Sequence, residues 1–373
     1  MKSAQRARYS ATLAAIFAAG LALAACNTPA PPPPPPPPPA APPPVALTSR
    51  VIEAAAAYKA YMDKTAKISP DFKDGDQVAQ SVRDAAGYET GGLQKGAAAY
   101  AAVAALQDAG FVANVRVYAV DPAQRRDMVA KIMADPTYVL GVKGADAAAG
   151  LAVAALDDAG AKVVTSGKAV KQAAYSVQHS AWSKADVPGR DARLALAKSL
   201  SGTMPPAAVD DSAKLQSATT GAPSSLGLTG AALPPPYTPT VVRGLAVAAI
   251  AALGEATDVN ADNLMLLLAD PGTEQCLRMA KLNLYQCLAV ARPHYEDIFC
   301  LGQHEMIDTG QCIVKAAGAP KPVEAVAPPP PEKPVPAKKP TKKAAAKKKK
   351  KELRLLTNDT VRSALHGGAD ACI

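Results

Sequence analysis

The sequence predicts an all-α protein, with alanine-rich helical repeats arranged as a solenoid or a bundle and a disulfide-stapled helical hairpin after them. Three observations support this prediction. Apolar residues make up 49% of the 373 residues but aromatic residues only 4%, so alanine dominates, and alanine is the strongest helix former. Residues 48–203 contain an internal repeat, and four of the six cysteines lie close together near the C-terminal end.

The chain begins with a basic stretch and an apolar run that ends in Leu23-Ala24-Ala25-Cys26. This segment resembles a bacterial lipoprotein signal peptide, in which these four residues are the lipobox. The resemblance implies that residues 1–25 are removed and that Cys26 is acylated. The covalent lipid on Cys26 is the only cofactor that we expect. Asn27 follows the cysteine, which in enterobacterial lipoproteins implies the outer membrane, with the protein facing the periplasm.

Residues 26–47 form the expected lipid anchor and linker, and most of them are prolines. The prolines occupy positions 29, 31–39 and 42–44. Such a run favours a polyproline II rod with a rise of about 3.1 Å per residue. The alternative is a disordered linker without a defined span, because proline isomers would soften the rod.

Residues 48–203 are predicted to be an alanine-rich helical repeat domain with an offset of fifty residues. Tyr, Gly, Val, Leu, Asp and Gly at positions 88, 91, 103, 106, 108 and 110 recur at 138, 141, 153, 156, 158 and 160. Gly110 and Gly160 are candidate C′ glycines that close a long helix. Asp121-Pro122 is typical of a helix start, which predicts a second helix to about Met133. A competing α/β interpretation places short strands at 138–142 and 162–165.

Residues 204–240 contain proline, serine, threonine and glycine and are predicted to be a linker. A second helical domain is expected over 241–318. Within it, Asp270-Pro271 predicts the start of a helix, and Arg292-Pro293 predicts its end.

This second domain carries the four clustered cysteines, Cys276, Cys287, Cys300 and Cys312. Export would place them in an oxidising compartment, where they would form disulfides. Cys276 and Cys287 are roughly 16 Å apart on one helix, and a disulfide needs Cα atoms within about 7 Å, so these two cannot pair. If the chain returns as an antiparallel helix, the two residue numbers of each facing pair add up to a nearly constant value. This predicts Cys276 with Cys312 and Cys287 with Cys300.

In a regular α-helix, Cys300 and Cys312 would not both face the first helix of this hairpin. Cys300 and Cys312 are twelve residues apart, about 120° off a common face of an α-helix. We therefore expect the second helix of the hairpin to be broken near Gly302 or Gly310.

Metal binding and catalysis have little support in the sequence. His294 and His304 could join the cysteines at a zinc site, but the spacings are wider than zinc sites use. His304-Glu305 begins like a metalloprotease motif, yet Asp308 stands where the second histidine is needed. His179 and Trp182 could line a pocket, but helix packing explains them better, because an aromatic side chain fills space well in an alanine-rich bundle. We expect no metal, no catalytic residues and no enzyme activity.

The net charge of +9 is concentrated near the C-terminus. Residues 321–354 hold eleven lysines and one arginine against three glutamates, which accounts for all of it. We expect a disordered Pro/Lys/Ala tail at 319–351 and a short C-terminal segment at 352–373. The tail resembles those of linker histones, but because of export we do not expect nucleic acid as a partner. Candidate polyanion-binding residues are Lys338, Lys339, Lys342, Lys343, Lys347, Lys348, Lys349, Lys350 and Lys351.

Together these features predict a lipid-anchored, non-enzymatic tether or scaffold of the cell envelope. Its expected partners are the membrane, reached through Cys26, and peptidoglycan or another anionic polymer, reached through the lysines. The alternative is a periplasmic assembly factor that binds an exported envelope protein through its helical repeats. Cys372 is left without a partner in this scheme and could form an intermolecular disulfide or remain a free thiol.

Overall fold

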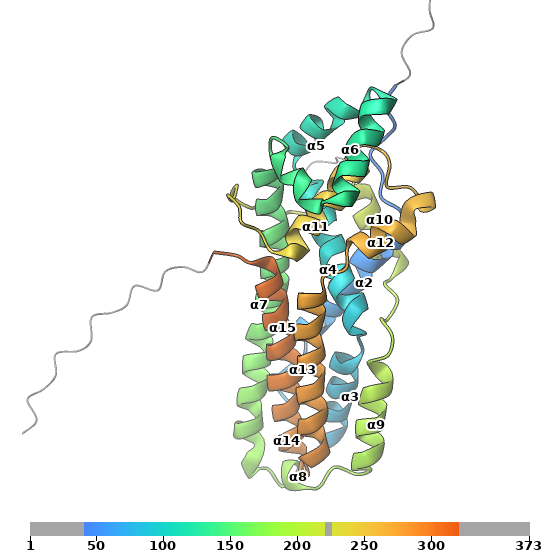
Figure 1. Ribbon diagram of the computed structural model, residues 1–373. Coiled ribbons are helices and arrows are strands. Elements are labelled where there is room, and N and C mark those ends of the chain that lie inside the picture. Colours follow the sequence, from blue (N-terminus) through green and yellow to red (C-terminus); the bar gives the residue numbers. More distant parts are fainter. Residues whose placement is uncertain (1–40, 221–225, 321–373) are drawn as a thin grey trace, which may run out of the picture. The chain divides into compact units, whose positions relative to one another are not determined.

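The computed structural model describes residues 41–220 and 226–320. In these ranges the protein is all-α, as predicted, with no strand (Figure 1). The α-helices are α2 (Ser49–Ala66), α3 (Gly75–Ala86), α4 (Thr90–Ala105), α5 (Ala109–Arg116), α6 (Pro122–Ala134), α7 (Ala145–Ser176), α8 (Ala181–Lys184), α9 (Arg190–Leu200), α10 (Val209–Ala218), α11 (Pro239–Ala252), α12 (Ala261–Leu267), α13 (Pro271–Val290), α14 (His294–Cys300) and α15 (Thr309–Ala317). The 3₁₀ turns are η2 (Val117–Ala119), η3 (Pro136–Gly141), η4 (Val177–His179) and η5 (Asp258–Asn260), and η6 (Leu301–Asp308) is a π-helix.

Several helix ends follow the local signals in the sequence. Asp121 caps α6 by accepting hydrogen bonds from the amides of Ala123 and Gln124, with Pro122 in the first turn. Asp270 does the same for α13. These side chains satisfy amide groups that have no partner within the helix. The predicted helix starts at Asp121-Pro122 and Asp270-Pro271 are therefore confirmed.

Helix α4 is the centre of the fold. Twelve of its 16 residues are buried, and it packs against α2, α7, α11 and α13. This arrangement is a bundle around a central helix, because elements far apart in the sequence pack together. In a solenoid each repeat contacts only its neighbours.

The two helical domains expected at 48–203 and 241–318 share one core, which corrects that division. Helix α11 of the second segment packs on α4 of the first, and α15 packs on α7. The intervening segment is also part of the core, because α10 contacts α2 and the amide of Leu233 donates to the carbonyl of Asp146. Small side chains on α4 and α11 make the contact possible, since they let the helix backbones approach closely.

Gly110 and Gly160 of the repeat do not end helices, and Gly160 serves close packing. The expected C′ role of Gly110 and Gly160 is wrong: α4 ends at Ala105, Gly110 lies within α5, and Gly160 lies inside the 32-residue α7. At Gly160 an added Cβ would lie 2.9 Å from the carbonyl oxygen of Gly310 on α15. The glycine is needed there because two backbones cross.

The α/β alternative is also excluded. Residues 138–142 lie in and directly after η3, and residues 162–165 lie inside α7. Without β-branched runs at matching positions, these segments continue the helical pattern.

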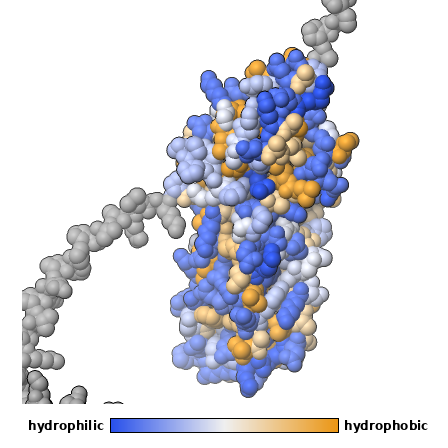
Figure 2. Space-filling model, viewed as in Figure 1, coloured by the Kyte–Doolittle hydropathy of each residue, from blue (hydrophilic) through white to orange (hydrophobic). Residues whose placement is uncertain are grey.

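The visible surface is mostly hydrophilic, with hydrophobic residues in small separate patches (Figure 2). Within residues 41–220 and 226–320, no single helix has both the length and the apolar character to cross a membrane. Helix α4 and Ala109–Ala119 meet these criteria only as a pair, bent by 87°.

We predict that Gly310→Val destabilises the protein by about 1–3 kcal/mol, because the added side chain cannot fit where α15 crosses α7. Added carbon at this position would meet the Gly160 carbonyl at 2.9 Å and the backbone nitrogen of Val164 at 3.0 Å. Urea denaturation measures the change. Gly141→Ala is the matched control, since a Cβ there meets no atom within 4 Å. Equal stability of the two variants would contradict the close-packing explanation.

Candidate functional site

The two disulfides join α13 to the helical run that follows it. Cys276 pairs with Cys312 at a Cα–Cα distance of 5.7 Å, and Cys287 pairs with Cys300 at 5.6 Å. This is the nested pairing that the sequence predicts for an antiparallel helical hairpin. The hairpin is therefore held covalently at two levels along its length.

A π-helix solves the phase problem between Cys300 and Cys312. The eight residues of η6 form a continuous helical run with α14 and α15, so the expected break near Gly302 or Gly310 is replaced by local under-winding. A π-helix bonds residue i to i+5, so each of its residues turns through a smaller angle than in an α-helix. Under-winding brings both cysteines onto the face that meets α13.

Gly302 and Gly310, where a break was expected, pack against α7 instead. A Cβ at Gly302 would lie 2.5 Å from the backbone nitrogen of Lys171. Gly302 and Gly310 thus let η6 and α15 lie directly on α7, which places the whole hairpin against the bundle.

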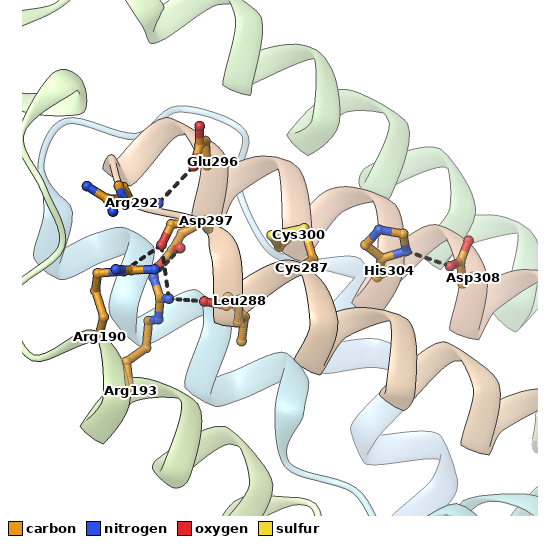
Figure 3. The surroundings of a disulfide bond; sticks show 11 residues. Arg190, Arg193, Cys287, Leu288, Arg292, Glu296, Asp297, Cys300, His304 and Asp308 are labelled. Carbon is orange, nitrogen blue, oxygen red and sulfur yellow. Dashed lines mark hydrogen bonds and ion pairs between the residues drawn. A yellow bond between two sulfur atoms is a disulfide. The ribbon is translucent and has the colours of Figure 1, made fainter.

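Two arginines of α9 close the end of the hairpin (Figure 3). Arg190 donates to the carbonyls of Ala289 and Ala291, and Arg193 donates to the carbonyl of Leu288. These carbonyls lie at the C-terminal end of α13, where they have no partner within the helix and where the helix dipole favours positive charge. Asp297 of α14 forms a buried ion pair with Arg193.

Asp297 is the carboxylate most perturbed by this arrangement. Burial raises its pKa from 3.8 to about 6, although the adjacent Arg193 and its hydrogen bond act in the opposite direction. Loss of solvent disfavours the charged form, and one guanidinium shared with backbone carbonyls does not fully offset that cost.

A second buried ion pair lies inside the hairpin, between Lys281 of α13 and Glu305 of η6, with Nζ and Oε1 3.0 Å apart. The Lys281 ammonium also donates to the carbonyl of Ala86 and lies 3.5 Å from the centre of the Tyr88 ring. Burial lowers the pKa of Lys281 and raises that of Glu305, while their mutual attraction opposes both shifts. The ammonium group of Lys281 thus links α13 to η6 and to the end of α3.

Two tyrosines extend this polar cluster into the bundle. The Tyr88 hydroxyl is 2.9 Å from the Thr309 hydroxyl oxygen, and the Tyr61 hydroxyl donates to the carbonyl of Ala85. Their ring centres are 4.8 Å apart. Desolvation raises both pKa values, because burial disfavours the phenolate. One oxygen of the cluster, Oε2 of Glu305, is buried without a hydrogen-bond partner. The contacts of the other groups link α2, α3 and the hairpin.

His294 and His304 take structural positions. His304 makes a 2.9 Å contact from Nδ1 to Asp308, four residues along the same helical run. The ring of His294 lies 6.3 Å from that of Trp182 and faces Gly75. In the part of the chain that the structure describes, no group of three or more His, Cys, Asp or Glu residues could hold a metal ion. His179 is exposed in η4.

A surface hollow of about 330 Å³ lies beside the Cys287–Cys300 disulfide. Its lining includes Tyr175 and Phe299, whose rings meet edge to face with centres 6.3 Å apart, and the exposed Val290. An aromatic hollow of this kind suits a hydrophobic side chain from a binding partner.

Several predicted site residues lie outside the described ranges. They are the acylation site Cys26, the leftover Cys372 and the nine candidate polyanion-binding lysines between positions 338 and 351. The functional assignments of these residues remain sequence-based predictions.

The buried ion pairs were not found by sequence reasoning, yet one of them leaves a signal. Leu277, Lys281, Leu284 and Leu288 follow the spacing of a core-facing helix stripe, and all four are buried. A lysine in such a stripe indicates a buried carboxylate partner, although spacing alone does not identify Glu305.

Comparisons of this chain with protein-family models, with curated proteins and with solved structures each return no match.

We predict that Lys281→Met destabilises the protein by about 3–5 kcal/mol, because it leaves Glu305 buried without its partner. The double variant Lys281→Met with Glu305→Leu should regain most of that loss. Arg278→Met is the control on the same helix, since it removes an exposed pair with Glu274 worth about 0.3–0.5 kcal/mol. Urea denaturation gives all values. A double variant no more stable than Lys281→Met would refute this account of the pair.

We also predict a pH dependence that comes from Asp297. Its pKa is higher in the folded protein than in the unfolded chain, so the folded state binds the extra proton between the two values. The stabilising contribution is therefore present below about pH 4 and is lost as the pH rises through about 6, with a magnitude of about 3 kcal/mol. Asp297→Asn should become more stable relative to the unsubstituted protein as the pH rises from 4 to 7.

The measurement is urea denaturation of both proteins across this pH range. Asp191→Asn, which removes an exposed carboxylate of α9, controls for the loss of one charge. A constant stability difference between the Asp297→Asn variant and the unsubstituted protein would contradict the prediction.

Proposed function

We propose that this protein is a membrane-anchored envelope lipoprotein that acts as a non-enzymatic tether between the membrane and an anionic surface such as peptidoglycan. The observation that carries the proposal is the order of parts along the chain. An acylatable Cys26 precedes, and a lysine-rich stretch follows, one compact helical unit. A tether needs two attachment chemistries at separate ends of a stable body.

The attachment of the N-terminal segment to the bundle supports this role. The Arg116 guanidinium donates to the carbonyls of Pro43 and Ala252, and the amide of Ala46 donates to Ala251. The chain therefore enters the unit already bound to the end of α11. A load on the lipid anchor would reach the core through these contacts.

The C-terminal exit is supported covalently. Helix α15 ends at Ala317 and is followed by Gly318, which has a φ of 65°. The Thr238 hydroxyl donates to the carbonyl of Ala316. Six residues earlier, Cys312 is bonded to Cys276 of α13. A load on the lysine-rich stretch would pass through this disulfide into the hairpin and the bundle.

The lysines suit an anionic polymer. Nine of them lie between positions 338 and 351, and near a charged surface each contributes up to about 1 kcal/mol. Such binding needs no fixed geometry and weakens as salt screens the charges. Peptidoglycan carboxylates are the proposed target, and the outer membrane is the proposed site of the lipid.

An assembly factor for an exported protein is the second candidate. The aromatic hollow beside Cys287 and Cys300 favours it, together with the exposed Met279, Leu282 and Val290 on α13. This function would depend on the hollow and would not require the lysines.

We predict that isolated cell-wall sacculi pellet the mature chain carrying Cys26→Ser, and that pelleting falls steeply as salt rises. Deleting residues 321–354, or changing the nine lysines to glutamine, should leave the protein in the supernatant. Tyr175→Ala in the aromatic hollow is the control that should pellet normally. Pelleting that is unchanged without the lysines would refute the tether, and pelleting lost in Tyr175→Ala would assign the wall contact to the aromatic hollow instead of the lysines.

A further inference from the structure

A second hollow, of about 510 Å³, lies between η2, α6 and η3, away from the hairpin. Its lining includes Tyr118, Tyr138, Val117, Val142 and Met128. Tyr118 and Tyr138 are 42% and 44% exposed and Val117 is 67% exposed, whereas Met128 is buried beneath them. The hollow thus exposes two tyrosine rings over an apolar floor.

Polar groups lie at the rim of the same hollow. Asn114 and Lys143 line it, and the Asn114 side-chain amide donates to the carbonyl of Lys143. The amide nitrogen carries a second N–H, and the Lys143 ammonium is a further donor. Donors beside aromatic rings suit a ligand that offers carbonyl oxygens and apolar rings but no amide hydrogens.

The helix beside this hollow already binds proline. Arg116 of α5, next to Val117 in the sequence, donates to the carbonyl of Pro43 at 3.0 Å. Gly254 has a φ of +78°, and a Cβ there would lie 2.7 Å from the Pro43 ring. The end of the proline-rich segment is therefore seated on the bundle at Arg116 and Gly254.

Nine consecutive prolines, residues 31–39, precede this seat by only a few positions. At about 3.1 Å per residue, an extended chain would cover about 12 Å in the four steps from Pro39 to Pro43, and a nine-residue polyproline II run would add ~25 Å. The ~12 Å connection is comparable with the diameter of a helix, about 10–12 Å.

We propose that the hollow lined by Tyr118 and Tyr138 is a docking groove for the protein's own proline run, residues 31–39. Polyproline II segments dock into aromatic-lined grooves because their conformation is preformed and little entropy is lost on binding. The short connection to Pro43 gives the run a high effective concentration at the groove. Docking would shorten the reach of the N-terminal linker, and release would lengthen it.

The proposal concerns the proline run alone and does not depend on the lipid or on the lysines. Its test uses the full-length mature chain with Cys26→Ser, in which residues 31–39 are replaced by a Gly/Ser sequence of equal length. The probe is a dye-labelled nonaproline peptide, and fluorescence anisotropy measures its binding. We expect saturable binding to the replaced chain and at least tenfold weaker binding to the chain that keeps its own prolines, because that run competes.

Groove variants of the replaced chain locate the binding. Tyr118→Ala should weaken binding at least tenfold, and so should Gly141→Leu, which fills the hollow where an added Cβ meets no atom within 4 Å. Tyr175→Ala, an exposed tyrosine of the other hollow, should bind as before. Circular dichroism confirms that each variant is folded.

Three results would overturn the proposal. The first is the absence of saturable binding by the replaced chain, and the second is equal affinity in the chains with and without their own prolines. In the third, the replaced chain does not bind the peptide but pellets with anionic phospholipid vesicles, and Tyr118→Ala abolishes this pelleting. That result would assign the tyrosines to a membrane surface instead.

Discussion

Close approach between helix backbones is the constraint on which the rest of the structure depends. The chain has few aromatic residues, and alanine is the commonest residue of its buried core. Alanines and glycines let α4 lie deep among α2, α7 and α11, and burial comes from many short contacts. This mode of packing tolerates little added volume, because each crossing is set by backbone atoms.

The hairpin is organised by the same constraint. Gly302 and Gly310 bring η6 and α15 onto α7, while the two disulfides hold α13 on their other side. The π-helical winding of η6 reconciles both requirements, since it turns the cysteines toward α13. Buried polar groups then specify the alignment: Lys281 binds Glu305 and Ala86, and Arg193 binds Asp297. Breaking either pair would leave an uncompensated buried charge, so the pairs disfavour other alignments of these helices.

The two surface hollows differ in what surrounds them. One lies beside the Cys287–Cys300 disulfide, which joins α13 to α14. The other lies between short helical elements near Arg116, where the N-terminal segment joins the unit. A tether interpretation assigns attachment to the chain outside the described ranges and leaves the bundle as the rigid body between the attachments. The hollows are where that body could bind protein segments.

The sequence by itself determined the all-α class, the helix starts at Asp121 and Asp270 and the cysteine pairs, because these depend on residues close in sequence or on one helix period. Tertiary structure alone decided that 48–203 and 241–318 share a core, and that Gly160 marks a helix crossing and not a helix end. It also decided that η6 is under-wound and that Lys281 meets Glu305. Each of these depends on which faces of distant helices meet, and local spacing carries no information about that choice.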